Sequence, residues 1–194
     1  MWNIPNQLTL LRIGMIPVFV ILYYLPWGWS HIASAAIFGL AALTDWVDGY
    51  LARKMSLETP FGAFLDPVAD KLIVVVALIM LLQANPSIWF ALPTVVIIGR
   101  EVVISALREW MAERALREEV AVSMLGKVKT WVQMAAIVFL LLAGKNSGGF
   151  SIIGYCGLYA SAGIALWSMV VYLKQAWPEM RRGNTTESGP TENQ

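Results

Sequence analysis

Four aspartates stand out in a chain that is otherwise mostly apolar: Asp45, Asp48, Asp66 and Asp70. Residues three or four apart share one face of a helix, so the spacing predicts two pairs of carboxylates, each pair on one helix face. Four unpaired carboxylates at close range repel one another or take up protons, and divalent cations resolve this. Ligands that are all oxygen favour magnesium, manganese or calcium. The pattern therefore predicts a site for two divalent metals, which suits chemistry on a phosphoryl group.

Small residues and one cation accompany the first pair of aspartates. Gly49 and Ala52 fall on the same helix face as Asp45, and Arg53 flanks that face, about 80° around the helix. Small side chains let a ligand approach the backbone closely. An arginine suits a diphosphate. The segment therefore predicts a ligand that carries phosphate groups.

Structural roles for the aspartates are the alternative interpretation. Asp66 precedes Pro67 and could cap a helix that begins at this proline. Asp45 and Asp48 could form salt bridges with Arg53 or Lys71. Capping accounts for one aspartate and leaves the regular spacing on two helices unexplained, and ionisable groups within a membrane are functional by default.

The rest of the chain must position these side chains, and its composition is that of a membrane protein. It has 194 residues, of which 58% are hydrophobic, and a mean hydropathy of +0.62. A net charge of only +1 argues against a nucleic-acid partner. The first apolar stretch is long and lacks a small-residue cleavage site, so we interpret it as a spanning helix. Runs of the length needed to cross a bilayer predict an all-α polytopic protein with six transmembrane helices, at 8–25, 32–54, 66–83, 88–112, 126–144 and 150–174.

The distribution of lysine and arginine predicts the orientation of these helices. The loops near 25–31 and 83–88 carry neither residue, and the loop near 144–150 carries only Lys145. Nine basic residues lie on the opposite side, which should be cytoplasmic: Arg53, Lys54, Arg114, Arg117, Lys127, Lys129, Lys174, Arg181 and Arg182. Both termini and the aspartates then face the cytoplasm. We expect one catalytic domain over residues 1–178, followed by a disordered polar tail over 179–194.

The complete set of positions resembles a known signature. The spacing Asp45-x2-Asp48-Gly49-x2-Ala52-Arg53-x8-Gly62-x3-Asp66-x3-Asp70 is similar to that of the CDP-alcohol phosphatidyltransferase family, without departure. The segments "NIPNQLTLLR", "REVVISALREWMAE" and "GKVKT" resemble the bacterial members that use glycerol 3-phosphate, so the likeness covers residues 3–175. It implies the six-helix CDP-alcohol phosphotransferase fold, a bacterial inner (plasma) membrane location and a homodimer.

The resemblance also implies roles for individual residues. The four aspartates would hold two Mg²⁺ or Mn²⁺ ions, and Asp70 would double as the general base. The CDP part of CDP-diacylglycerol would contact residues of the signature and of the first two helices: Asn6, Thr9, Arg12, Gly49, Arg53 and Thr59. The products would be CMP and a phospholipid.

Cations in the second half of the chain point to the acceptor. Four of them would face the metal site and suit a phosphorylated alcohol such as sn-glycerol 3-phosphate, which would become phosphatidylglycerol phosphate: Arg100, Arg108, Lys127 and Lys129. An internal ion pair with Glu101, about 20° from Arg108 on the helical wheel, is the alternative for the fourth helix. The two lysines lie near the predicted cytoplasmic interface, where positive residues are expected in any case.

Other functions stay open at this point. A family member that acts on serine, inositol phosphate, choline or phosphatidylglycerol is the nearest alternative. A membrane prenyltransferase also binds diphosphate through aspartates, but the positions of Gly49, Ala52, Arg53 and Gly62 speak against it. A divalent-cation transporter would be expected to place its carboxylates near the bilayer midplane, between discontinuous helices.

Overall fold

The computed structural model describes residues 4–55, 60–113, 124–144 and 148–183. These residues form six α-helices and no strand. The helices are α1 (Ile4–Tyr24), α2 (Ser30–Met55), α3 (Pro60–Ala84), α4 (Ile88–Glu113), α5 (Met124–Ala143) and α6 (Gly149–Gly183). Each predicted span overlaps one of these helices almost entirely, which confirms the all-α architecture.

Local sequence explains two of the helix ends. α3 begins at Pro60, and the fixed φ of proline suits the first position of a helix. α5 is followed by Gly144, whose φ of 55° is the left-handed conformation that commonly ends a helix at glycine. Because α3 begins at Pro60, Asp66 lies inside the helix, and its interpretation as a cap before Pro67 is wrong. α6 continues to Gly183, into the segment predicted as a tail, and the rest of that segment lies outside the described residues.

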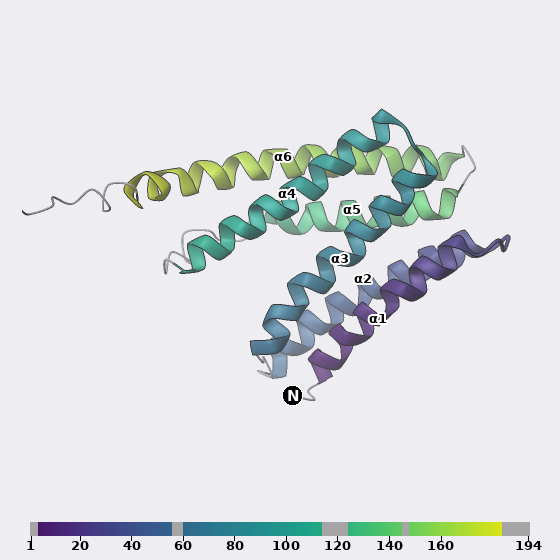
Figure 1. The fold of residues 1–194 in the computed structure, drawn as a ribbon, viewed down its shortest axis with the longest axis horizontal. Helices are drawn as coiled ribbons and strands as arrows, with labels where there is room; N and C mark the ends of the chain where they lie inside the picture. The colour runs from purple at the N-terminus through teal and green to yellow at the C-terminus, as the bar shows by residue number, and fades with distance from the viewer. Residues whose placement is uncertain (1–3, 56–59, 114–123, 145–147, 184–194) are drawn as a thin grey trace, which may run out of the picture.

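The helices form two groups of three (Figure 1). α1 packs against α2 and α3, while α6 packs against α4 and α5. Contacts of α5 with α2 and of α4 with α3 join the two groups. The start of α1, the end of α2 and the start of α3 gather at one end of the molecule (Figure 1). The bundle therefore brings the backbone segments that carry the four aspartates to a common end.

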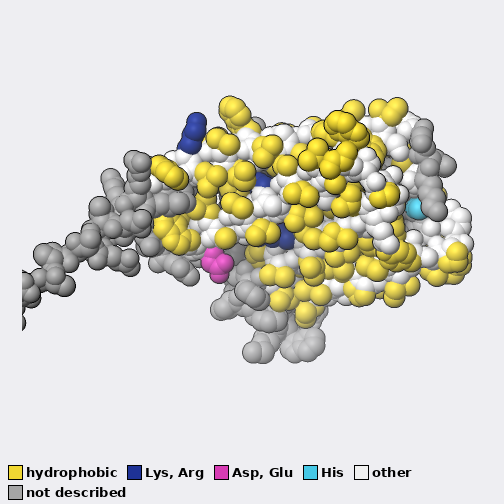
Figure 2. Space-filling view, turned by 45° about the horizontal axis from the view of Figure 1, so that its top comes forward, with side chains coloured by type: hydrophobic (Ala, Val, Ile, Leu, Met, Phe, Trp, Pro, Cys, Tyr) yellow, Lys and Arg dark blue, Asp and Glu magenta, His cyan; other side chains and the backbone are white. Residues whose placement is uncertain are grey.

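Apolar side chains cover the surface, while several polar ones are buried. Exposed large side chains include Ile21, Val95, Ile152 and Trp167, and Figure 2 shows an apolar surface with few charges. Four helices are long and apolar enough to cross a membrane, and the described apolar parts of α2 and α5 are shorter. An apolar exterior around buried polar groups is the pattern expected of a protein that faces lipid.

Two glycines allow α5 and α6 to pack closely. A Cβ added to Gly157 would lie 2.8 Å from the Cβ of Ala136, and one added to Gly154 would lie 2.6 Å from the Cγ of Leu140. Small residues at such contacts let the backbones of membrane helices approach each other. These glycines therefore set the distance between the two helices.

Replacing Gly157 tests this packing. We expect Gly157→Ala to lower the stability by about 1–3 kcal/mol, because the new methyl overlaps a side chain that has no flexible end to move. The measurement is thermal unfolding in detergent, followed by tryptophan fluorescence. Gly163→Ala on the same helix is the control, since nothing lies within 4 Å of its added Cβ, and it should unfold at or above the wild-type temperature. Equal transitions for the two variants would contradict the role of Gly157.

Candidate active site

The helix backbones place the predicted carboxylates on two neighbouring helices. Asp45 and Asp48 lie on α2, and Asp66 and Asp70 lie one turn apart on α3. α2 and α3 contact each other, and the end of α2 lies beside the start of α3 (Figure 1). The side chains of Asp45, Asp48 and Asp66 lie outside the described residues, so their convergence stays a prediction.

Among the four aspartates, Asp70 is the one whose side chain the structure describes. It faces a buried arginine. The Nη1 atom of Arg12 on α1 lies 3.6 Å from the Oδ1 atom of Asp70 on α3. The arginine side chain is 1% exposed, whereas that of Asp70 is 37% exposed. Asp70 is thus anchored to the bundle on one side and accessible on the other, as a group that receives a proton from a substrate must be.

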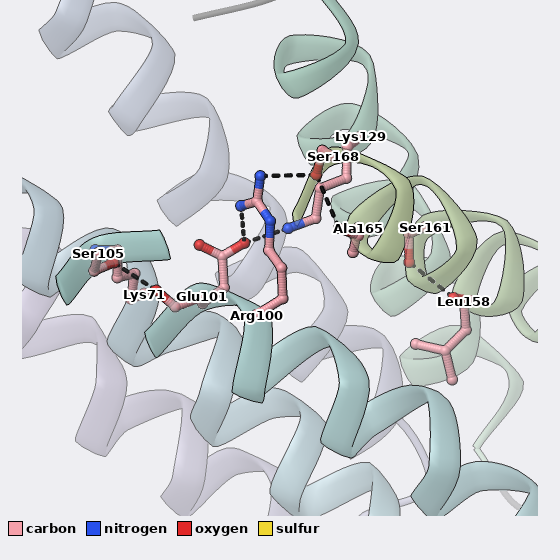
Figure 3. A network of polar contacts seen from close by, with 9 residues as sticks. All are labelled: Lys71, Arg100, Glu101, Ser105, Lys129, Leu158, Ser161, Ala165 and Ser168. Atoms are coloured by element: carbon pink, nitrogen blue, oxygen red, sulfur yellow. Dashed lines mark hydrogen bonds and ion pairs between the residues drawn. The ribbon is translucent and has the colours of Figure 1, made fainter. Parts of the chain in front are cut away.

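A second polar group lies where α4, α5 and α6 meet (Figure 3). The Oε1 atom of Glu101 accepts a hydrogen bond of 3.1 Å from Nη1 of Arg100 and also pairs with Nζ of Lys129. Nη2 of Arg100 donates to Oγ of Ser168 on α6, at 3.1 Å. Arg100 and Lys129 are 7% and 2% exposed. Two of the four predicted acceptor cations therefore come together, with one carboxylate between them.

The same group extends towards Asp70. Lys71, the residue after Asp70, donates a hydrogen bond to Oγ of Ser105 on α4. Ser105 in turn donates to the backbone carbonyl of Glu101, at 2.5 Å. Side chains on α3 and α4 thus connect the surroundings of Asp70 with the surroundings of the cation pair.

The remaining predicted site residues divide into two sets. Thr9 is fully buried on α1, one turn before Arg12. Both residues lie inside the bundle, and their contact with a nucleotide stays a prediction. For the other set the side chains lie outside the described residues: Asn6, Gly49, Arg53, Thr59, Arg108 and Lys127.

The donor chemistry of the four aspartates fits a hard divalent cation. The candidate ligands are all carboxylate oxygens, which magnesium and manganese accept. Within the part of the chain that the structure describes, no three His, Cys, Asp or Glu side chains form a group, and only Asp70 of the four has a described side chain. The residues present thus fit such a metal by type and by helix position.

A cavity of about 440 Å³ lies at the opposite end of the bundle, between the loop after α1 and the ends of α3 and α5. Tyr23, His31 and Gln83 are among the residues that line it, and no predicted site residue does. Its place separates it from Asp70. The cavity therefore does not belong to the candidate active site.

Comparison with known proteins identifies the family. The sequence model of the CDP-alcohol phosphatidyltransferases matches residues 2–174, which include all four aspartates and both described cations of the α4–α5 pair. The chain belongs to the CDP-alcohol phosphatidyltransferase family. With its apolar helices, this CDP-alcohol phosphatidyltransferase is a polytopic membrane protein.

Several relatives are similar to this chain over almost their whole length. A CDP-diacylglycerol–glycerol-3-phosphate 3-phosphatidyltransferase of Pseudomonas fluorescens is 49% identical over 191 residues, which cover 95% of each chain. Proteins of the same name from Sodalis glossinidius and Salmonella paratyphi A are 52% and 48% identical, over 90% of this chain and 94% and 95% of their own. The similarity therefore includes both the aspartate segment and the helices that carry the acceptor cations.

The structure adds residues that sequence reasoning did not assign to the site of this CDP-alcohol phosphatidyltransferase. Ser168 and Ser105 support Arg100 and Lys71, and Glu101 pairs with Arg100 and Lys129. The sequence feature that could have indicated this contact is Ser168, a serine within an apolar run of α6. Serine is also common at contacts between membrane helices, so this signal alone does not indicate a site.

Proposed function

We propose that this protein transfers the phosphatidyl group of CDP-diacylglycerol to sn-glycerol 3-phosphate and releases CMP and phosphatidylglycerol phosphate. The observation that carries the proposal is the match, over nine-tenths or more of both chains, to relatives with that printed activity. The paired Arg100 and Lys129 favour a phosphorylated acceptor over a neutral alcohol.

The reaction needs a base, and Asp70 is our candidate. Its carboxylate would take the proton of the acceptor hydroxyl. The acceptor oxygen then forms a bond to the phosphorus that bears diacylglycerol, and the bond from that phosphorus to the oxygen of CMP breaks. The partial exposure of Asp70 and its anchoring by Arg12 support this role, since a base must reach the substrate while keeping its position.

Asp45, Asp48, Asp66 and Asp70 would hold two divalent ions, Mg²⁺ or Mn²⁺. When bound, such ions would offset the negative charge of the diphosphate and of the departing CMP. Gly49 would leave space for the nucleotide, and Arg53 would pair with the diphosphate. Asn6, Thr9, Arg12 and Thr59 complete the nucleotide side of the proposed site.

Arg100 and Lys129 would bind the phosphate of the acceptor, together with Arg108 and Lys127. Charge-assisted hydrogen bonds from buried cations to a phosphate are strong and directional. Because the two described cations already lie on one carboxylate oxygen, little reorganisation is needed to bring both to a phosphate. This supports an acceptor with a terminal phosphate group.

We further propose that the enzyme is a homodimer of the bacterial inner membrane, with both termini and the active site in the cytoplasm. The loops after α1 and α3 carry no lysine or arginine, which supports this orientation. It places the site where water-soluble glycerol 3-phosphate and CMP can enter and leave.

The proposed acceptor is tested with purified enzyme and a panel of alcohols. CDP-diacylglycerol is offered with glycerol 3-phosphate, inositol phosphate, serine or phosphatidylglycerol, and the lipid product is identified by mass spectrometry. We expect product from glycerol 3-phosphate alone. Product from another alcohol, with none from glycerol 3-phosphate, would reassign the acceptor. Metal flux into liposomes without CMP release would indicate a transporter.

Lys129→Met tests the acceptor side by removing one charge while nearly keeping the volume. We expect the KM for glycerol 3-phosphate to rise roughly tenfold or more, because a buried charge-assisted contact is lost, with little change in the KM for CDP-diacylglycerol. Initial rates at varied concentrations of each substrate give both constants. An unchanged KM for glycerol 3-phosphate would show that Lys129 does not bind the acceptor.

A further inference from the structure

Glu101 lies between two buried cations of the acceptor side (Figure 3). Its Oε1 atom is 3.1 Å from Nη1 of Arg100 and also pairs with Nζ of Lys129. One cation comes from α4 and the other from α5. A single carboxylate oxygen thus contacts the charged groups of side chains from two helices.

This arrangement explains how two like charges stay together inside the bundle. Arg100 is 7% exposed and Lys129 is 2% exposed, and burial disfavours a charged lysine unless an anion compensates it. Without the carboxylate the two cations would repel each other and lose a shared partner. Glu101 therefore offsets part of this positive charge and fixes the positions of both side chains.

Neighbouring side chains hold the Arg100–Lys129 pair in place, and one N–H group of Arg100 remains available to bind a further anion. Ser168 on α6 accepts from Nη2 of Arg100, and Ser105 is fixed to the backbone of Glu101. The Nε atom of Arg100 is buried without a hydrogen-bond partner among the described residues. Buried polar groups normally have a partner, so this N–H is a place where an incoming anion would be bound.

The local charge matches a phosphate monoester. Lys71 is linked to the backbone of Glu101 through Ser105. Among these described side chains Lys71, Arg100 and Lys129 are cations and Glu101 is a carboxylate, which sums to two positive charges. A phosphate monoester carries close to two negative charges at pH 7, whereas a neutral alcohol carries none.

We propose that Glu101 is a positioning residue for the acceptor. It holds Arg100 and Lys129 as a preassembled, charged pair to which the terminal phosphate of the acceptor binds. This inference rests on the proposed function and adds to it a residue that itself repels the phosphate. Its negative charge is useful because it orders the two cations before the substrate arrives, which lowers the cost of binding.

Glu101→Gln tests the proposal by removing the charge at nearly constant volume. We expect the KM for glycerol 3-phosphate to rise about tenfold or more, while the KM for CDP-diacylglycerol changes less than about twofold. Glu101→Asp, which keeps the charge on a shorter side chain, should give an intermediate KM. Glu109→Gln is the matched control, since Glu109 is exposed on the same helix, and it should behave as the wild type.

A double-mutant cycle separates positioning from a general structural effect. If Glu101 acts through Lys129, combining Glu101→Gln with Lys129→Met should raise the KM for glycerol 3-phosphate no further than the stronger single change. The proposal would be overturned if the KM of the double variant rose by the product of the two single increases. It would also be overturned if Glu101→Gln raised the KM values for glycerol 3-phosphate and CDP-diacylglycerol equally, or left the KM for glycerol 3-phosphate unchanged. If Glu101→Gln does not fold, the comparison of Glu101→Asp with wild type decides, and a wild-type KM in that variant overturns the proposal.

The outcome also separates this inference from the proposed function. Wild-type enzyme that makes no lipid from glycerol 3-phosphate would contradict the function itself, before any variant is considered. Wild-type enzyme that makes this lipid, with Glu101→Gln showing the same KM, would contradict only the role of Glu101.

Discussion

Asp70→Asn should lower kcat by about a hundredfold to ten-thousandfold, because an amide cannot accept the proton of the acceptor hydroxyl. The substitution keeps the shape of the side chain, and Arg12 beside it stays in a position to contact an amide oxygen. We therefore expect the protein to fold and the KM for glycerol 3-phosphate to change little. The measurement is CMP release under saturating concentrations of both substrates.

Two comparisons make this result specific. Glu109→Gln makes the same change from carboxylate to amide on an exposed position of α4 and should leave kcat unaltered. Because Asp70 is also a proposed metal ligand, the rate is measured over a range of Mg²⁺ concentrations. Activity that returns at high Mg²⁺ would assign Asp70 to metal binding alone, and wild-type activity at all concentrations would exclude it from both roles.

Removal of divalent metal should abolish activity to a similar degree. Dialysis against a chelator should lower the rate roughly a thousandfold, since metal ions supply several kcal/mol of charge stabilisation in phosphoryl transfer. Added Mg²⁺ or Mn²⁺ should restore the rate. Residues 45–70 contain no histidine or cysteine, so Zn²⁺ should restore the rate poorly.

Thermal unfolding of the chelated protein serves as the control for chelation. The apolar core formed by residues such as Phe19, Phe38 and Leu141 does not depend on a metal. The unfolding temperature without substrate should therefore fall only slightly when metal is removed. Full activity in excess chelator would contradict a metal-dependent reaction.

Much of the fold was predictable because the thickness of a bilayer fixes the length of a helix that crosses it. Six apolar runs correspond to six helices, since a membrane requires every backbone polar group to be satisfied within the segment. The ends were less predictable: α3 begins at Pro60 and not near Asp66. Hydropathy marks the part of a helix that lies in hydrocarbon, whereas hydrogen bonding continues through the polar turns beyond it.

The candidate site, like the fold, could be predicted from the sequence only in part. The spacing of the aspartates is a property of single helices, so their helix positions could be predicted from α2 and α3 separately. The contacts of Glu101 with Arg100 and with Lys129 on α5 could not be predicted, because the helical wheel points only to Arg108, whose side chain lies outside the described residues. Contacts between helices depend on their rotation and depth, which a single sequence does not display.

The central claim is that this membrane protein joins glycerol 3-phosphate to the phosphatidyl group of CDP-diacylglycerol. The most direct measurement supplies purified protein with CDP-diacylglycerol, isotope-labelled glycerol 3-phosphate and Mg²⁺, and quantifies CMP and labelled lipid over time. The account predicts equal amounts of CMP and labelled phosphatidylglycerol phosphate, with neither formed when one substrate is omitted. CMP release without label in the lipid, or no CMP release at all, would contradict it.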